Sequence, residues 1–389
     1  MHGHPARMSW YDPRQFGWEG ILLAAVPVAI AASLLQGPAV LRFGAAGVAI
    51  IPLASLMGRA TEQLAHRLGP AIGGLMNATF GNAAELILAM FALFRGLDDV
   101  VKASLTGSII GNLLLVMGAS LLAGGLKFPF QQFNRTAAAA GSTLLVLATM
   151  GLIIPAMFHH LVGPGAMGLE HRLSIAVCVI LVITYILNLI FSLGTHKNLM
   201  SGVPNEDLAK IDEKVWGIRH SSGALLGATL TVAWMSEILV GAVEETSHSL
   251  GLGAVFMGVI IVAIVGNAAE HSTAILMAMK NQMDLAVGIA LGSALQVALF
   301  VAPVLVFASY LRDTPMDLIF STLEVVAVIL AVLIAKMVAE DGESHWLEGA
   351  MLLMVYAILG VAFFYLPDSV AGHAAGTAPA AASSAVPHR

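Results

Sequence analysis

The sequence predicts an all-helical integral membrane protein, and three observations lead to this fold class. Of the 389 residues, 58% are hydrophobic and only 11% are charged, whereas a soluble domain carries about 25% charged residues. The apolar residues are gathered into runs of about 20, the length of a helix that crosses a bilayer. One pentapeptide within such a run also occurs a second time, which predicts two related halves.

Eleven apolar runs predict eleven membrane-spanning helices, joined mostly by short connections that contain charged, Gly or Pro residues. The first run is predicted to be a retained accessory helix, because the polar segment 1–18 before it lacks a signal-peptide cleavage pattern. The predicted spans are 19–36, 39–58, 69–94, 100–125, 136–157, 172–194, 221–242, 252–279, 284–309, 316–337 and 345–366.

Two segments differ from the spans, and the basic residues orient the whole chain. Residues 195–220 form the longest polar connection and are expected to be a cytoplasmic linker, whereas residues 367–389 have the composition of a disordered tail. Lys and Arg gather in alternate connections, which places the N-terminus and the linker in the cytoplasm and the C-terminus outside. Arg95 and Lys102 are exceptions, because this orientation places their connection outside.

The pentapeptide Gly-Asn-Ala-Ala-Glu occupies residues 81–85 and returns unchanged at 266–270. A shift of 185 residues aligns the two copies and much of their surroundings without a gap. The copies lie five spans apart, and an odd separation means that they cross the membrane in opposite directions. Such inverted repeats are typical of secondary transporters, which bind substrate near the midplane where the repeats meet. We therefore predict a first repeat at 39–194 and a second at 221–366.

Each copy offers the chemistry of a cation site. Asn and Glu lie three residues apart, so we expect their side chains to share one helix face. Carboxylate, amide, hydroxyl and carbonyl oxygens are the ligands of Ca²⁺, and two facing carboxylates in a medium of low dielectric constant also favour protonation. A site built from Glu85, Glu270, Asn82 and Asn267 could hold either a divalent cation or protons. A single copy could also be a small-residue packing motif whose Glu bonds to a neighbouring helix, and the inverted duplication makes the ion site the favoured interpretation.

The helices that follow the two copies add further oxygen ligands. The same shift pairs Ser108 with Ser293. Asn112 lies four residues after the first serine and Gln296 three residues after the second, so each pair shares a helix face. Cation binding and ordinary hydrogen bonding between helices account for these residues equally well.

Several other polar residues are secondary candidates. Glu237 lies well inside the seventh apolar run, and Glu62 matches Glu245 across the repeats when two residues are inserted. His271 directly follows a signature glutamate and could move protons, although adjacent helical positions diverge by about 100°. Glu324 in the tenth run has no evident partner, so structural and functional interpretations are equal for it.

Other classes of function lack support in the sequence. The single cysteine, Cys178, excludes a disulfide framework and a thiolate metal site. The P-loop pattern GxxxxGK is absent, so we expect no use of ATP. HExxH and GxSxG are absent too, so we predict no enzyme and no cofactor. No basic block indicates nucleic acid.

At the two signature pentapeptides and their surroundings, the sequence resembles the calcium/proton exchanger (CAX) family of the cation/calcium exchanger superfamily. The resemblance covers the second to the eleventh span. Its most specific segments are 60–62, 73–87, 236–237 and 258–274. It implies that the two signature glutamates alternately bind Ca²⁺ and protons, and that a helix pair at the edge of the bundle moves. The residues that it places at the cation are Glu85, Glu270, Asn82, Asn267, Ser108, Ser293 and Gln296.

One departure from the wider superfamily concerns the coupling ion. Sodium/calcium exchangers carry Ser or Thr and Pro before the signature Glu, where this sequence has Gly, Asn and Ala, which favours protons. We predict a secondary antiporter that exports cytosolic Ca²⁺ in exchange for protons in a bacterial plasma membrane, alone or as a homo-oligomer. A Na⁺- or K⁺-coupled exchanger is the nearest alternative, and a passive cation channel is a more remote one.

Overall fold

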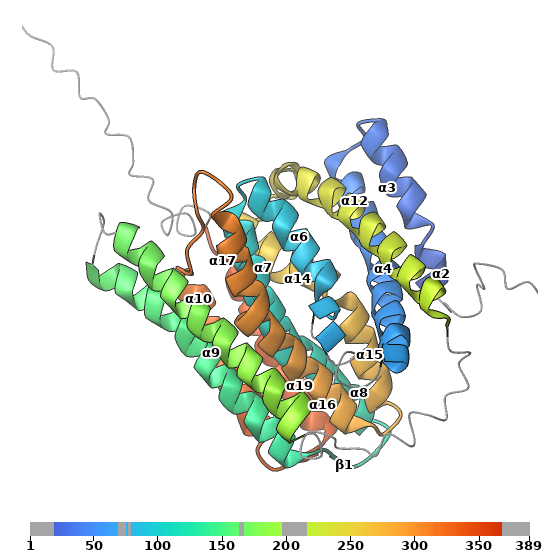
Figure 1. Cartoon of the computed structure of the whole chain (residues 1–389), viewed down its shortest axis with the longest axis vertical. Helices are drawn as coiled ribbons and strands as arrows, with labels where there is room; N and C mark the ends of the chain where they lie inside the picture. The colour runs from blue at the N-terminus through green and yellow to red at the C-terminus, as the bar shows by residue number, and fades with distance from the viewer. Residues whose placement is uncertain (1–18, 69–74, 77–78, 163–166, 197–215, 368–389) are drawn as a thin grey trace, which may run out of the picture.

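The computed structural model is a bundle of long helices (Figure 1). The residues that it describes are 19–68, 75–76, 79–162, 167–196 and 216–367. Three predicted segments fall wholly or mostly outside these residues: the N-terminal segment 1–18, the linker 195–220 and the tail 367–389.

The helices follow one another along the chain with short connections. They are α2 (Glu19–Leu22), α3 (Ala25–Leu34), α4 (Ala39–Leu68), α6 (Ala83–Phe94), α7 (Asp98–Ile110), α8 (Met117–Gly125), α9 (Arg135–Val162), α10 (Met167–Leu189), α12 (Ile218–Leu250), α13 (Ala254–Phe256), α14 (Ala263–Gly266), α15 (Ala268–Ala278), α16 (Met283–Gln296), α17 (Ala302–Ser309), α18 (Thr322–Val338) and α19 (Trp346–Phe364). Turns of π-helix extend or join some of them: η1 (Gly111–Val116), η2 (Ile190–Thr195), η4 (Met257–Val262) and η5 (Val297–Val301).

The lengths of these helices suit a membrane protein. Within the described residues, seven helices are long and apolar enough to cross a bilayer, and the bent pair Ala254–Gly266 and Ala268–Ala278 would make an eighth. The predicted class, an all-helical membrane protein, is therefore confirmed. Three shorter stretches, α2–α3, α6 and α18, occupy the remaining predicted runs.

Two predicted spans are not single straight helices. The run 19–36 is divided by a turn between α2 and α3, where Ala24 N donates to Ile21 O at 3.1 Å. The run 252–279 bends by 60° beside Asn267, where α14 ends and α15 begins. The first difference shortens a helix at the edge of the bundle, whereas the second lies within a signature segment.

The tenth span begins later than its apolar run predicts. Residues 316–337 become helical only at Thr322, because Ser321 caps the helix and its hydroxyl accepts a hydrogen bond from Glu324 N. The Glu324 carboxylate accepts in return from Ser321 N at 2.8 Å, and Thr106 Oγ1 lies 3.4 Å from its other oxygen. Glu324 thus has partners that its sequence context did not reveal, and it acts as a buried helix cap.

The long helices α4 and α12 lie along each other at one edge of the bundle, with α3 outside them (Figure 1). Arg42 near the start of α4 pairs with Glu245 near the end of α12 at 2.6 Å. At the other end of the pair, Gln63 Oε1 accepts from Trp216 N at 2.9 Å. The two helices are therefore antiparallel. The helices α9 and α10 form the opposite edge (Figure 1).

Two short strands tie connections together at one end of the bundle. Strands β1 (Gln131–Gln132) and β2 (Glu343–Ser344) pair antiparallel, with Gln131 opposite Ser344. They join the segment after α8 to the segment between α18 and α19. A prediction based on apolar runs does not detect strands of two residues.

Lys102 does not lie in an exposed loop, as the orientation argument had assumed. It belongs to α7, is buried, and pairs with Asp317 at 2.5 Å. A lysine neutralised in this way carries little weight in a count of free loop charges. Of the two exceptions to the charge bias, only Arg95 is an exposed residue of the connection.

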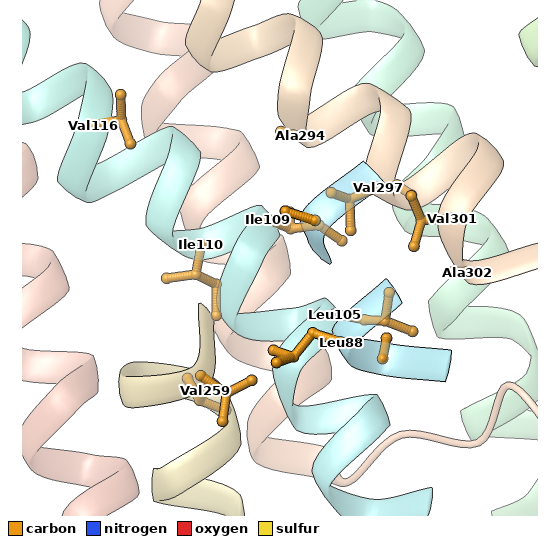
Figure 2. Packing of buried hydrophobic residues seen from close by; sticks show 14 of the residues in the cluster. Leu88, Leu105, Ile109, Ile110, Val116, Val259, Ala294, Val297, Val301 and Ala302 are labelled. Carbon is orange, nitrogen blue, oxygen red and sulfur yellow. The ribbon is translucent and has the colours of Figure 1, made fainter. Parts of the chain in front are cut away.

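Helices from both halves of the chain share one apolar core. Figure 2 shows Leu105, Ile109 and Ile110 of α7 packed near Val259 and Val297, which belong to the second half. Helix α7 contacts both η4 and η5. The core therefore does not divide into two separate halves.

Glycine allows the closest crossing in this core. A Cβ added at Gly107 of α7 would lie 2.1 Å from Val259 O, and one added at Gly258 would lie 2.5 Å from Ala103 Cβ. Both distances are far below contact, so the backbones meet only because these residues have no side chain. Small residues serve this purpose in many membrane helix pairs.

Candidate functional site

Both signature pentapeptides lie at the beginning of a helix. Helix α6 begins after Asn82 and α15 after Asn267, and each asparagine has a non-helical backbone (φ −101° and φ −103°). Each Asn is the N-cap of its helix, and its carbonyl accepts the first helical bond, from Leu86 N at 2.9 Å or His271 N at 3.0 Å. The Glu lies in the first turn, so the predicted sharing of one helix face stays a prediction. Asparagine favours such positions because its amide competes with backbone hydrogen bonds. Neither asparagine caps its own helix through its side chain.

The amide of Asn267 instead joins three elements. Its Nδ2 donates to Ser108 Oγ at 2.9 Å and to Ala263 O at 3.0 Å, and it lies 3.4 Å from Glu85 Oε1. Its Oδ1 accepts from Asn112 Nδ2 at 3.2 Å. The second signature segment is thus connected to the glutamate of the first segment and to the α7–η1 helix.

The amide of Asn82 makes the complementary connection to α16. Its Nδ2 donates to Gln296 Oε1 at 3.1 Å and lies 3.5 Å from Ser293 O. The hydroxyl of Ser293 lies 3.2 Å from Asn82 Oδ1 and 3.1 Å from Glu270 Oε2, and it accepts from Asn112 Nδ2 at 2.9 Å. One network therefore contains all seven primary candidates from the sequence, and Asn112 joins its two halves.

The network has a reciprocal arrangement. Asn82 of the first half contacts Ser293 of the second, and Asn267 of the second half contacts Ser108 of the first. Asn112 lies in the π-helical turn η1, which overlaps η5 when the chain is shifted by 185 residues. Turns of π-helix occur often at functional sites.

Burial makes the carboxylates of this network chemically distinctive. Glu85 is 4% exposed, and its Oε2 has no hydrogen-bond partner among the described residues; the same holds for Asn112 Oδ1. Glu270 is half-buried. Within the described part of the chain, no Lys or Arg forms an ion pair with either glutamate. A buried carboxylate without a cationic partner requires a bound cation or a proton.

The ligand set suits a transported hard cation. No group of three or more His, Cys, Asp and Glu residues that could hold a metal ion occurs in the described regions. The network instead combines two carboxylates with amide and hydroxyl oxygens. Neutral oxygens with few charges bind hard cations less tightly than a cluster of acids does. This composition is appropriate for an ion that must also leave.

The secondary candidates lie outside the network. Glu62 and Glu237 are exposed, and Glu245 is an exposed residue paired with Arg42. The Nε2 of His271 is buried without a hydrogen-bond partner in the described residues. Asn112, which the family resemblance did not place at the cation, is fully buried at the centre of the network. Its position four residues after Ser108 was the available signal.

The helices α6 and α15, which begin at the two signature segments, bring a buried and a half-buried carboxylate into one network, and this arrangement is that of a membrane ion exchanger. The sodium/calcium exchanger protein family matches residues 38–194 and 220–365, so this chain belongs to that family. The family assignment made from the signature residues is thereby confirmed, and the chain is an exchanger, not an enzyme.

Known relatives span nearly the whole chain. The Ca²⁺/H⁺ antiporter of Aphanothece halophytica is 47% identical over 361 residues, which cover 89% of this chain and 96% of the relative. The Ca²⁺/H⁺ antiporter ChaA of Bacillus subtilis (strain 168) is 46% identical over 347 residues, 89% and 98% of the two chains.

Solved structures share the fold. The structure of native YfkE superposes with a TM-score of 0.77 at 45% identity, covering 90% of this chain and all of that one (100%). The crystal structure of the H⁺/Ca²⁺ exchanger CAX gives a TM-score of 0.64 and covers 92% and 95% of the two chains. Its identity of 16% limits that likeness to the fold alone.

Proposed function

We propose that this chain is a Ca²⁺/H⁺ antiporter that exports Ca²⁺ from the cytosol across a bacterial plasma membrane. The network that joins Glu85 and Glu270 through amides and hydroxyls of both halves is the observation that carries this proposal. The two relatives named as Ca²⁺/H⁺ antiporters support the choice of ions.

Exchange follows from the charge of this site. Two ionised carboxylates neutralise one Ca²⁺, and the oxygens around them replace part of its hydration shell. When Ca²⁺ leaves, two unpaired charges in a region of low dielectric constant are unfavourable, so protons take its place. Ca²⁺ and protons therefore compete for Glu85 and Glu270, and each passage in one direction requires the other ion to return.

Asn82, Asn267, Ser108, Ser293 and Gln296 complete the proposed coordination. The two buried oxygens without partners, Glu85 Oε2 and Asn112 Oδ1, support a site with unused ligand capacity. An amide can turn its oxygen toward a cation and its nitrogen toward a neighbouring acceptor. The network would accordingly rearrange when the cation enters.

The topology that best fits this site has eleven spans. An accessory helix at 19–36 would be followed by inverted five-helix repeats at 39–194 and 221–366, with the N-terminus in the cytoplasm. The reciprocal asparagine contacts support this proposal, as does the antiparallel packing of α4 on α12, which would be the first helix of each repeat.

Alternating access would involve this α4–α12 pair. Each of the two helices packs most extensively on the other, at the edge of the bundle. A pair with that arrangement can move as one body against the central helices while the site stays in place. The site would then face each side of the membrane in turn.

A flux assay tests the proposed function. Purified protein is reconstituted into vesicles, a pH gradient is imposed, and ⁴⁵Ca²⁺ uptake is measured with and without a protonophore. We expect uptake to follow the gradient and to disappear in the Glu85→Gln variant. Uptake that requires Na⁺, shown by its loss when choline replaces Na⁺, would instead identify a sodium-coupled exchanger. Uptake that ignores both gradients would contradict antiport.

A further inference from the structure

The signature helices α6 and α15 are both anchored at the end that lies away from the network. Helix α6 has 12 residues and α15 has 11, and each carries its Asn and Glu at the N-terminal end. The last carbonyl groups of a helix have no partner within it. Here Leu93 O and Ala278 O accept from Gly96 N and Asn281 N in the turns that follow, and each also receives a side chain from the opposite half of the protein.

Arg312 anchors the end of α6. Its Nη1 donates to Leu93 O in the last turn of that helix, and its Nη2 lies 2.8 Å from Asp98 Oδ1 at the start of α7. Arg312 follows α17 and thus belongs to the second half, whereas α6 and α7 belong to the first. A cation at a helix C-terminus also interacts favourably with the helix dipole.

Gln131 and Lys127 anchor the end of α15. Gln131 Nε2 donates to Ala278 O at 2.9 Å and to Asn281 Oδ1 at 3.0 Å, and Lys127 Nζ donates to Met279 O at 3.4 Å. Gln131 is 1% exposed. Both anchoring residues follow α8 in the first half.

The two anchored carbonyls are related by the internal repeat. The shift of 185 residues that superimposes the signature segments also places Lys127 on Arg312, and it places Leu93 on Ala278. The same carbonyl of each signature helix is therefore bound by the segment that follows the Gly-Ser helix of the other half. The side chains that bind this carbonyl are not equivalent in the repeat: Gln131 aligns with Met316, and Lys127, which aligns with Arg312, binds the next carbonyl, that of Met279.

We propose that Arg312 and Gln131 are positioning residues for ion exchange, each of which holds one signature helix from its far end. A helix of three turns is rigid, so a shift at its C-terminus displaces the Asn and Glu at its N-terminus by a similar distance. This inference rests on the proposal that Glu85 and Glu270 form the exchange site. The position of each carboxylate would then be determined by a residue of the opposite half of the chain.

The transport test compares Arg312→Met with Arg312→Lys in the vesicle assay. Loss of a charge-assisted hydrogen bond should raise the KM for Ca²⁺ about tenfold with a smaller change in maximal rate. Lysine should restore most of the affinity, because it keeps the charge and a donor. Gln131→Leu should raise the KM in the same way through α15. Lys336→Met removes an exposed cation at the end of α18 and serves as the matched control.

Hydrogen–deuterium exchange supplies a readout that is independent of transport. Arg312→Met should speed amide exchange in α6 and leave α15 unchanged, and Gln131→Leu should do the reverse. An unchanged KM, equal loosening of both helices, or a lysine variant no better than methionine would overturn the anchoring role. Absence of proton-coupled uptake by the wild-type protein would count against the proposed function instead. The difference in amide hydrogen exchange between α6 and α15 is measured without transport, so it tests the anchoring role separately.

Discussion

The two signature segments have the same sequence but different surroundings. Glu85 is almost fully buried, with one oxygen near Asn267 and the other without a partner, whereas Glu270 is half-buried and contacts Ser293. Two identical pentapeptides thus differ because the packing around them differs. The proposed inverted repeat would produce such an asymmetry if only one side of its site were accessible at a time.

Neutralising one carboxylate at a time tests whether the two signature segments contribute equally to one site. We expect Glu85→Gln and Glu270→Gln each to reduce proton-driven ⁴⁵Ca²⁺ uptake to background, a loss of about 100-fold or more, because one remaining charge cannot balance Ca²⁺. Membrane abundance of each variant is the control. If one variant kept four-fifths of the activity, the two segments would not share a site.

Replacing the two signature asparagines should raise the KM for Ca²⁺ by different amounts. Asn267 contacts Ser108, Glu85 and Asn112, whereas the bonds of Asn82 run to α16 alone. We expect Asn267→Ala to raise the KM for Ca²⁺ by about 30-fold and Asn82→Ala by about tenfold, since each lost buried bond costs about 1 kcal/mol or more. Equal effects in the same assay would show that the extra contacts of Asn267 are not used.

A change of pH should affect both carboxylates together. Because protons compete with Ca²⁺, the KM for Ca²⁺ should fall as the pH rises on the side from which Ca²⁺ binds. The fall should reach at most about 100-fold per pH unit, the limit when two protons leave for each Ca²⁺. Initial uptake rates over a pH series, with the opposite side held constant, measure the slope. A KM independent of pH would exclude a shared site.

The smallest effect is expected at His271. It directly follows Glu270 in the sequence but makes no hydrogen bond through its buried Nε2 among the described residues. We expect His271→Ala to change the rate of uptake by no more than about threefold. Full inactivation of a protein that still reaches the membrane would show that this histidine moves protons, and would add a further difference between the two segments.

Much of the fold could be predicted from the apolar runs, because a helix must bury about 20 residues to cross a bilayer. Details that depend on neighbours were not predictable in this way. The late start of α18 reflects the cap formed by Ser321 and Glu324, and the burial of Lys102 reflects its pairing with Asp317, which is far away in the sequence. The assignment of two repeats and eleven spans stays a prediction.

Some features of the candidate site could likewise be predicted from the sequence, and others could not. The repeated pentapeptide was sufficient to select Glu85 and Glu270 as candidates, because acids within apolar runs are costly and rarely without function. The break in the helix beside each asparagine was not evident, because both signature segments lie inside apolar runs that predict unbroken spans. The central place of Asn112 was also not evident, since its partners Asn267 and Ser293 are 155 and 181 residues away.

The sequence by itself determined that this protein is a helical membrane protein with a duplicated acidic signature. Composition, run length and repetition are properties of the chain that do not depend on how its helices meet. Only the tertiary structure decided which residues of the two halves touch: Asn82 with Ser293, and Asn267 with Ser108. Those contacts depend on the angles and distances at which helices cross, and these are set by side-chain packing over the whole bundle.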